Sequence, residues 1–336
     1  MTRPSPYDRA ALVRFAHQSI RKGSKSFSAA SRLFDRETRE RVWLLYAWCR
    51  ACDDIADDQD HGRGRGRGVD AEQGSGQAGL DPESRLATIR TLTELAIAGE
   101  QTGSRAFDAL GQLLYEVPIP QVMLEDVIAG FELDAREWRP RSESDMLRYC
   151  YHVAGAVGVL MAAVMGVSCD ESDPEAADTL DRACDLGLAF QLSNIVRDVW
   201  EDDANGRCYL PVEWLVEADI PPGEHTKPHY RARLVTIVAR ACALARGYEE
   251  SSRAGAMRLP FRQRWAILAA ANIYGGIGRE VERLGAHAWD HRVSTSKLRK
   301  AEYLAAAWHE ARGGIAPVLE RPGLGRRDLM ELARAD

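Results

Sequence analysis

The feature that most constrains the fold of this chain is the helical spacing of its apolar residues. Apolar side chains recur every three or four positions, while the strict alternation typical of a β-strand is almost absent. Proline interrupts this spacing where one helix is expected to end and another to begin, as at Pro118, Pro120 and Pro211. The pattern predicts an all-α fold with helices within residues 12–20, 42–55, 86–97, 122–133, 147–167, 180–199, 234–245, 265–284 and 298–315.

No seam rich in Pro or Gly divides these helical segments, so the sequence predicts one domain over residues 8–320. Residues 59–81 differ from the rest, because they contain a Gly-Arg repeat at 62–68 followed by Gly74-Ser75-Gly76. Such a composition does not form a packed core, which predicts a flexible insertion loop between two helices. RNA binding by the repeat is disfavoured, because the repeat is short and carries no aromatic residue.

Composition narrows the class of protein. Of the 336 residues, 45% are hydrophobic and 28% are charged, so the chain can bury a substantial core. The formal net charge of −6 argues against nucleic acid as the main partner, since a phosphate backbone requires a basic surface. Seven cysteines, an odd number, suit a reducing cytoplasm better than a disulfide framework.

Two segments bear on localisation. Residues 1–19 lack the apolar core of a secretory signal. The longest apolar stretch, residues 153–167, is shorter than the roughly 20 residues that a membrane-spanning helix needs, and it is rich in Gly and Ala. We therefore expect a cytoplasmic protein in which this stretch is a helix buried within a helical bundle.

A first polar stripe lies in the segment 43–57. Tyr46, Arg50, Asp53 and Asp57 stand at i, i+4, i+7 and i+11, which places them on one face of a helix. Asp53 and Asp57 repel each other one turn apart unless a cation relieves the repulsion. A hard divalent ion that also binds substrate phosphates is such a cation.

A second stripe lies in the segment 191–202. Asn194, Asp198 and Asp202 recur at i, i+4 and i+8, and Gln191 precedes them by one turn on the same side. Again two carboxylates stack one turn apart, here beside two neutral amides that can complete the hydrogen bonds of a metal ion or a phosphate group.

One such stripe alone is typical of a solvated helix face. Both stripes, however, lie within predominantly apolar segments, and each has aligned polar companions. We predict that the two helices face each other, because divalent cations and an anionic ligand would neutralise the converging carboxylates. A diphosphate bridged by hard divalent ions suits these oxygen ligands better than a zinc site does, because zinc prefers His and Cys ligands.

At this point the residues resemble a known family. Five ordered segments are similar to motifs of the squalene/phytoene synthases, within a match that extends from about Leu12 to Leu304. These segments are residues 24–27 (an N-terminal flap), 46–57 (the first aspartate-rich motif), 149–158 (a tyrosine–VAG helix), 191–211 (the second aspartate-rich motif) and 288–292 (an element of bacterial phytoene synthases).

The resemblance implies an isoprenoid-synthase helical bundle around a deep central apolar pocket. It implies that Asp53 and Asp57 hold Mg²⁺ on one substrate diphosphate, and that Asp198 and Asp202, with Asn194, hold it on the other. It places Tyr149 near the reacting carbons, with a role in steering the cation and in proton transfer. The implied substrate contacts are Ser24, Lys25, Ser26, Phe27, Tyr46, Arg50, Gln191, Asn194, Arg197, Tyr274 and Arg292.

The implied activity is that of a Mg²⁺-dependent prenyltransferase, with Mn²⁺ as the alternative ion and no nicotinamide cofactor. Residues 149–155 and 288–292 favour condensation of two geranylgeranyl diphosphates through prephytoene diphosphate to phytoene, a step of carotenoid biosynthesis. Two alternatives stay open. One is a fifteen-carbon enzyme that makes dehydrosqualene, squalene or hydroxysqualene from farnesyl diphosphate, and the other is a non-catalytic assembly factor.

The lipid-like substrate and product predict peripheral contact with the inner face of the membrane, and downstream carotenoid enzymes are possible partners. Two features leave structural alternatives. Trp200 stands where the family commonly has a small or aliphatic residue, and it would narrow the pocket if it pointed inward. Small residues such as Gly155 and Gly158 either leave room for apolar tails or allow close helix packing.

Overall fold

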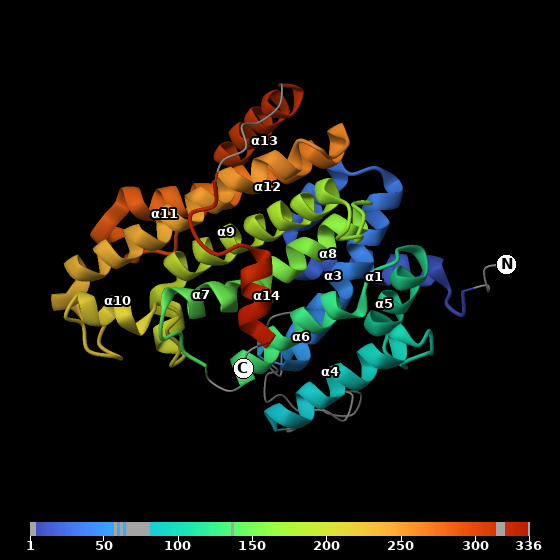
Figure 1. Ribbon diagram of the computed structural model, residues 1–336, viewed down its shortest axis with the longest axis horizontal. Helices are drawn as coiled ribbons and strands as arrows, with labels where there is room; N and C mark the ends of the chain where they lie inside the picture. Colours follow the sequence, from blue (N-terminus) through green and yellow to red (C-terminus); the bar gives the residue numbers. More distant parts are fainter. Residues whose placement is uncertain are drawn as a thin grey trace. The chain divides into compact units, whose positions relative to one another are not determined.

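The computed structural model describes residues 5–56, 59–60, 63–64, 81–135, 138–313 and 320–334. The regular secondary structure of these residues is almost entirely helical, as the periodicity predicts (Figure 1). Their only strands are β1 (Gln59–Asp60) and β2 (Arg63–Gly64), which pair antiparallel with Asp60 opposite Arg63. This short ladder lies in the segment that we expected to be a flexible loop. Most of that segment is outside the described residues.

Contacts divide the described residues between two compact units. The first unit takes those within Met1–Arg136 and Ala163–Gly166, and the second takes those within Glu137–Ala162 and Val167–Asp336. Each unit is considered by itself below, and the single domain expected for residues 8–320 stays a prediction.

The first unit is built around α3. Its elements are α1 (Arg9–Gly23), α2 (Lys25–Ala30), η1 (Ser31–Leu33), α3 (Arg36–Ala56), α4 (Pro82–Ile97), α5 (Arg105–Glu116) and α6 (Gln121–Ala135). Helix α3 contacts α1, α4, α5 and α6, and it buries Leu44, Leu45 and Trp48 completely. The opposite side of α3 keeps Tyr46, Arg50 and Asp53 half-buried, so the apolar spacing orients the first stripe away from the core.

The second unit is built around α9. Its elements are α7 (Glu143–Cys150), η2 (Tyr151–Gly155), α8 (Ala156–Val164), α9 (Pro174–Ala204), α10 (Val212–Glu217), η3 (Pro228–Tyr230), α11 (Arg231–Ala256), α12 (Phe261–Leu284), η4 (Gly285–His287), α13 (Lys297–Arg312) and α14 (Arg326–Arg334). The last residues of α8 belong to the first unit.

Helices α11 and α12 pack along α9, and α13 packs on α12 (Figure 1). Local signals set the ends of α9. The Asp173 carboxylate accepts a hydrogen bond from the Glu175 amide at 3.0 Å, and Pro174 occupies the first turn. Gly206 follows the helix with a φ of 73°, a value that glycine adopts without strain. Leu188, Leu192 and Val196 bury one side of α9.

Residues of the tyrosine–VAG segment form an unusual turn where they meet α9. Residues Tyr151–Gly155 adopt π-helical hydrogen bonding between α7 and α8, a distortion that often accompanies functional sites. A β-carbon at Gly158 would overlap the Ala183 carbonyl group, and one at Gly187 would overlap that of Ala154. Close helix packing therefore explains the glycine at position 158, without the alternative that it leaves room for an apolar substrate tail.

One helix among the described residues, Glu143–Val164, is long and apolar enough to cross a membrane. In its most apolar window, however, 72% of the residues are buried inside the structure. This burial agrees with the expectation of a core helix in a bundle.

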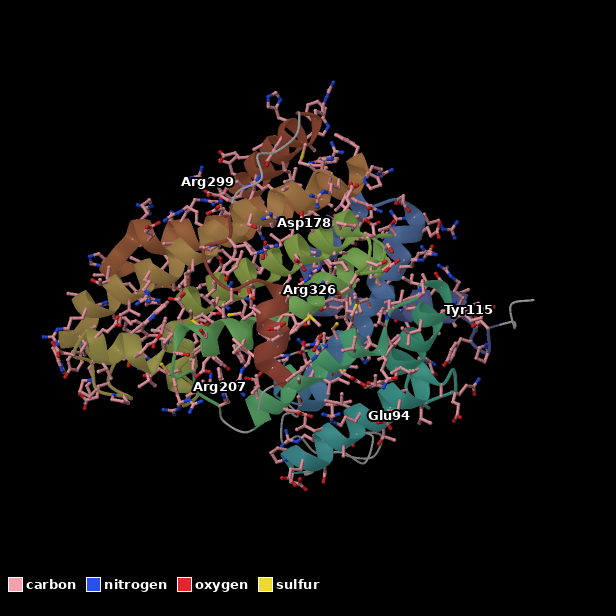
Figure 2. The ribbon with its side chains drawn as sticks, viewed as in Figure 1. Glu94, Tyr115, Asp178, Arg207, Arg299 and Arg326 are labelled. Carbon is pink, nitrogen blue, oxygen red and sulfur yellow. The ribbon has the colours of Figure 1, made fainter. Side chains whose placement is uncertain are left out.

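Two arginines, the buried Arg326 and the half-buried Arg321, attach the C-terminal segment to α9. Arg326, labelled on α14 in Figure 2, is 2% exposed and donates to Asp181 at 2.7 Å. Arg321 donates through Nε to both carboxylate oxygens of Asp185, at 2.9 and 3.0 Å. Asp185 is completely buried and also accepts from the Ser251 hydroxyl at 2.6 Å. These ion pairs hold residues 320–334 on the second unit.

Candidate functional site

In the first stripe, the guanidinium group of Arg50 lies close to two carboxylates. Arg50 on α3 donates to Asp54 at 2.5 Å and lies 3.8 Å from Asp53. The pattern aligned Arg50 with Asp53, whereas the structure brings it closer to Asp54. Arg50 and Asp54 stand four residues apart, a spacing that favours an ion pair on a helix, but Asp54 was not included in the predicted stripe. Asp57 lies outside the described residues, so its place in the stripe stays a prediction.

The predicted flap meets this stripe through an aromatic contact. Helix α1 ends at Gly23, and the Ser24 hydroxyl accepts from the Phe27 amide at 3.2 Å where α2 begins. The Phe27 ring lies 5.8 Å from the Tyr46 ring on α3. Burial raises the pKa of Tyr46 to about 12, so its hydroxyl stays protonated at neutral pH. The described residues thus join Ser24, Phe27, Tyr46 and Arg50 in one place. The side chains of Lys25 and Ser26 are outside them.

The second stripe is organised by two arginines. Arg197 donates through Nε to Asp198 at 2.6 Å. Arg292 reaches the same carboxylate with two parallel hydrogen bonds of 3.1 Å, from Nε and from Nη2. It also lies 2.9 Å from Glu201. Such forked contacts suit planar oxyanions, which include both carboxylates and phosphates.

The amides that precede these acids lie side by side on α9. The side-chain amide of Asn194 donates to Gln191 at 3.4 Å, one turn before Asp198. The structure therefore places Gln191, Asn194, Arg197 and Asp198 in consecutive turns of α9, with Arg292 on Asp198 and with Asp202 one turn further along the same helix. The roles that the resemblance gives these residues stay predictions.

The two carboxylates of this stripe differ in their electrostatics. Burial alone would raise the pKa of Asp198, but hydrogen bonds from Arg197 and Arg292 outweigh it, so this pKa lies below its usual value. Burial and the nearby charge of Asp198 raise the pKa of Asp202 to about 7. At Asp202 the nearby arginines therefore do not outweigh burial and the repulsion from Asp198, and a divalent cation beside Asp202 would favour its ionised form.

Tyr149 lies in a stack of three aromatic rings. Its ring is stacked on Tyr209 at 4.7 Å and on Trp138 at 5.8 Å between centroids. Tyr149 is almost fully buried. Tyr209 lies within the second aspartate-rich motif, residues 191–211, for which no role of Tyr209 was predicted, and Trp138 was not predicted.

Tyr274 on α12 also stacks on an aromatic ring, that of Phe190, with 4.2 Å between centroids. Phe190 directly precedes Gln191, so this contact brings the predicted substrate residue Tyr274 beside the start of the second stripe. Burial raises the pKa of the Tyr274 phenol, which keeps it neutral.

The arrangement of the whole site stays a prediction. The first stripe lies in one unit and the second in the other, so their meeting around a shared pocket stays a prediction. Within the described part of the chain, no three His, Cys, Asp or Glu side chains form a ready metal cluster. A cleft of about 410 Å³ lies beside α1 and α5, where it includes Leu12, Arg14 and Phe15, but it contains no residue of either stripe.

Comparisons with known proteins define the class. Residues 20–299 match the squalene/phytoene synthase family. A dehydrosqualene synthase of known structure shares the fold with a TM-score of 0.75 at 24% identity, over 90% of this chain and 97% of that one. This likeness supports the helical isoprenoid-synthase fold that the motifs implied.

More similar sequences refine this placement. The phytoene synthase of Pseudescherichia vulneris is 44% identical over 318 residues, which cover 94% of this chain and 98% of the relative. The 15-cis-phytoene synthase of Pantoea ananas is 43% identical over 300 residues, covering 89% and 92%. The chain belongs to the squalene/phytoene synthase family.

Proposed function

We propose that this protein is a phytoene synthase, a prenyltransferase that joins two geranylgeranyl diphosphates head to head through prephytoene diphosphate. The observation that carries the proposal is the forked contact of Arg292 with Asp198, beside Arg197 and one turn before Asp202. The names of the bacterial relatives support the choice of phytoene as product and carotenoid biosynthesis as the pathway.

The chemistry requires stabilisation of a leaving diphosphate. The carbon–oxygen bond of an allylic diphosphate breaks only when the negative charge on the departing group is balanced. Arg197 and Arg292 are preorganised cations for this purpose. We propose that Asn194, Asp198 and Asp202 hold Mg²⁺, or Mn²⁺, which when bound supplies Lewis-acid stabilisation of the same charge. We assign Asp53, Asp57 and Arg50 the equivalent role for the other substrate.

The remaining residues orient the substrates and exclude water. Ser24, Lys25, Ser26 and Phe27 would close over a bound diphosphate beside Tyr46. Water would quench an allylic cation, so closure protects the reaction. Tyr149 is held by aromatic rings on both sides, and we propose that it steers the cation and assists the final proton loss.

We also propose that the protein works in the cytoplasm, in peripheral contact with the inner face of the membrane. The substrate tails and the product are lipid-like, so delivery and release are easiest beside a lipid surface. Downstream carotenoid enzymes would receive the product there. No nicotinamide enters this reaction, because forming the conjugated product requires proton loss and no reduction.

Product analysis tests the proposal. Purified protein with Mg²⁺ is incubated separately with farnesyl diphosphate and with geranylgeranyl diphosphate, and the extracted hydrocarbons are identified by mass spectrometry. We expect phytoene from the twenty-carbon substrate without added reductant. Exclusive turnover of the fifteen-carbon substrate would instead indicate a dehydrosqualene-type enzyme. Absence of both turnover and Mg²⁺-dependent binding of a diphosphate analogue would indicate an assembly factor.

A further inference from the structure

Two tryptophans stack on each other next to the second stripe, and one of them, Trp200, lies between Asp198 and Asp202 in the sequence of α9. The indole rings of Trp200 on α9 and Trp289 after η4 are stacked, with 4.8 Å between centroids and 22° between planes. The Trp289 indole N–H donates to the Val196 carbonyl at 3.0 Å, in the turn of α9 that leads to Trp200. Trp200 is thus engaged by a side chain of its own unit, which explains a bulky residue where the family commonly has a small one.

A third side chain completes this contact. The Arg231 guanidinium lies over the Trp200 ring, 5.4 Å from its centroid. Arg231 also donates to Asp290 at 2.5 Å, and Asp290 lies 2.8 Å from the His287 ring nitrogen. The residue before Asp290 is Trp289, so two adjacent residues of this segment are anchored to α9 and α11.

The anchored segment leads directly to Arg292. The Arg292 side chain is 56% exposed, and it contacts Asp198 from a stretch without regular helix. An exposed arginine on a free loop gains little from an ion pair, because holding its long side chain in one geometry costs entropy. On a free loop Arg292 would also lose backbone freedom, and the side-chain contacts of Trp289 and Asp290 remove part of this additional cost before a ligand arrives.

We propose that Trp200 and Trp289 are positioning residues that hold Arg292 at the second diphosphate site. The inference rests on the proposed function, because it takes Arg292 and Asp198 as parts of that site. It predicts that the indole pair acts on substrate affinity through Arg292, although neither indole has to touch the substrate. Simple core packing would instead predict an effect on stability alone.

The variants separate these two roles. Trp200→Ala removes the stacked face, while Trp200→Phe keeps an aromatic face in its place. Trp289→Phe keeps a ring but loses the N–H donor to Val196. The matched control is Trp265→Phe, because the Trp265 indole donates to the Leu304 carbonyl at 2.9 Å and packs on a cluster of α12 and α13 away from the stripe.

Steady-state kinetics with geranylgeranyl diphosphate gives the first readout. We expect Trp200→Ala and Trp289→Phe to raise KM about three- to tenfold, with kcat changed less than about twofold. Trp200→Phe should restore KM to within about twofold of the wild type. Trp265→Phe should lower the melting temperature as much as Trp289→Phe does, yet leave KM unchanged.

Binding of inorganic diphosphate in the presence of Mg²⁺, measured by calorimetry, gives a second readout that does not depend on turnover. The same order of variants is expected in Kd. If Trp200→Ala does not fold, Trp289→Phe and Trp200→Leu carry the test.

Two reference variants separate failure of the inference from failure of the proposed function. If Asp198→Asn and Arg292→Ala lower kcat/KM while the tryptophan variants keep wild-type KM and Kd, the positioning role is overturned and the function stands. If Asp198→Asn and Arg292→Ala keep the wild-type kcat/KM, the site assignment and the positioning role both fall.

Discussion

Several aspartates of helix α9 are contacted by arginines from far along the chain, and two of them, Asp185 and Asp198, lie in different surroundings. Asp185 is completely buried and binds Arg321, whereas Asp198 keeps 16% of its side chain exposed and binds Arg292. Both contacts use the arginine Nε atom, at 2.9 and 3.1 Å.

The difference in solvent access separates a structural ion pair from a candidate site. A ligand cannot reach Asp185 without unfolding its surroundings, so the charge of Arg321 serves the fold. At Asp198 water and ligands have access, and the two arginines can exchange the carboxylate for a phosphate group. The following predictions test whether one aspartate serves stability and the other serves function.

The largest effect is expected from Asp198→Asn. The change keeps the size of the side chain and removes the charge that pairs with Arg197 and Arg292. We expect kcat/KM for the prenyl diphosphate to fall about a hundred- to a thousandfold, as when one preorganised electrostatic group is lost from a site. Initial rates at saturating Mg²⁺ measure the effect. Circular dichroism should show unchanged helix content, and activity within a factor of three of wild type would contradict the assignment.

The next effect is expected from Arg321→Ala. This change leaves the Asp185 carboxylate buried with Arg182 and Ser251 as its remaining neighbours. Breaking a buried pair from one side costs about 3 kcal/mol, because the remaining charge has lost its partner. Urea denaturation at pH 7 measures the free energy of unfolding. The KM of the folded fraction should stay at the wild-type value, and a changed KM with unchanged stability would reverse the comparison.

The same variant should recover part of its stability in acid. Burial raises the pKa of Asp185, and the charge of Arg321 is the main influence that lowers it, so its loss raises this pKa further. When a carboxyl group has a raised pKa in the folded state, the free energy of unfolding of the protein decreases as the pH rises through that pKa. The deficit of Arg321→Ala relative to wild type should therefore be smaller at pH 5 than at pH 7 in urea denaturation. A deficit that grows on acidification would contradict this account.

Apolar spacing was sufficient to predict the main helices of both units. The segment 180–199 is part of α9 and 42–55 is part of α3, while caps such as Asp173 and Asp81 extend the helices beyond the apolar residues. Helix α14 was not predicted, because Arg326 anchors it through buried charge and a search for apolar spacing does not detect that. Helix α5 was missed although Phe107, Leu110 and Leu113 carry the expected spacing.

The sequence identified most of the candidate site residues, but it did not predict most of the contacts between them. Positions on one helix face follow from the spacing, which is why Gln191, Asn194 and Asp198 were identified together. The Arg292–Asp198 pair joins residues 94 positions apart, and only tertiary structure selects such partners. The same holds for Trp289 and for Trp138, since aromatic stacking partners carry no local signal.

The smallest effect separates the two arginines. Arg292→Ala removes an exposed ion pair, and such pairs contribute about 1 kcal/mol or less to stability. We therefore expect a melting temperature within a few degrees of wild type, in contrast to Arg321→Ala. The loss should appear as a rise in KM of about tenfold, equivalent to about 1.4 kcal/mol of lost binding. Arg292→Lys keeps the charge but cannot form the forked contact, so it should recover only part of the affinity. Full recovery by lysine would mean that charge alone acts at this position, and the geometry of the Asp198 contact would then have no role in recognising the diphosphate.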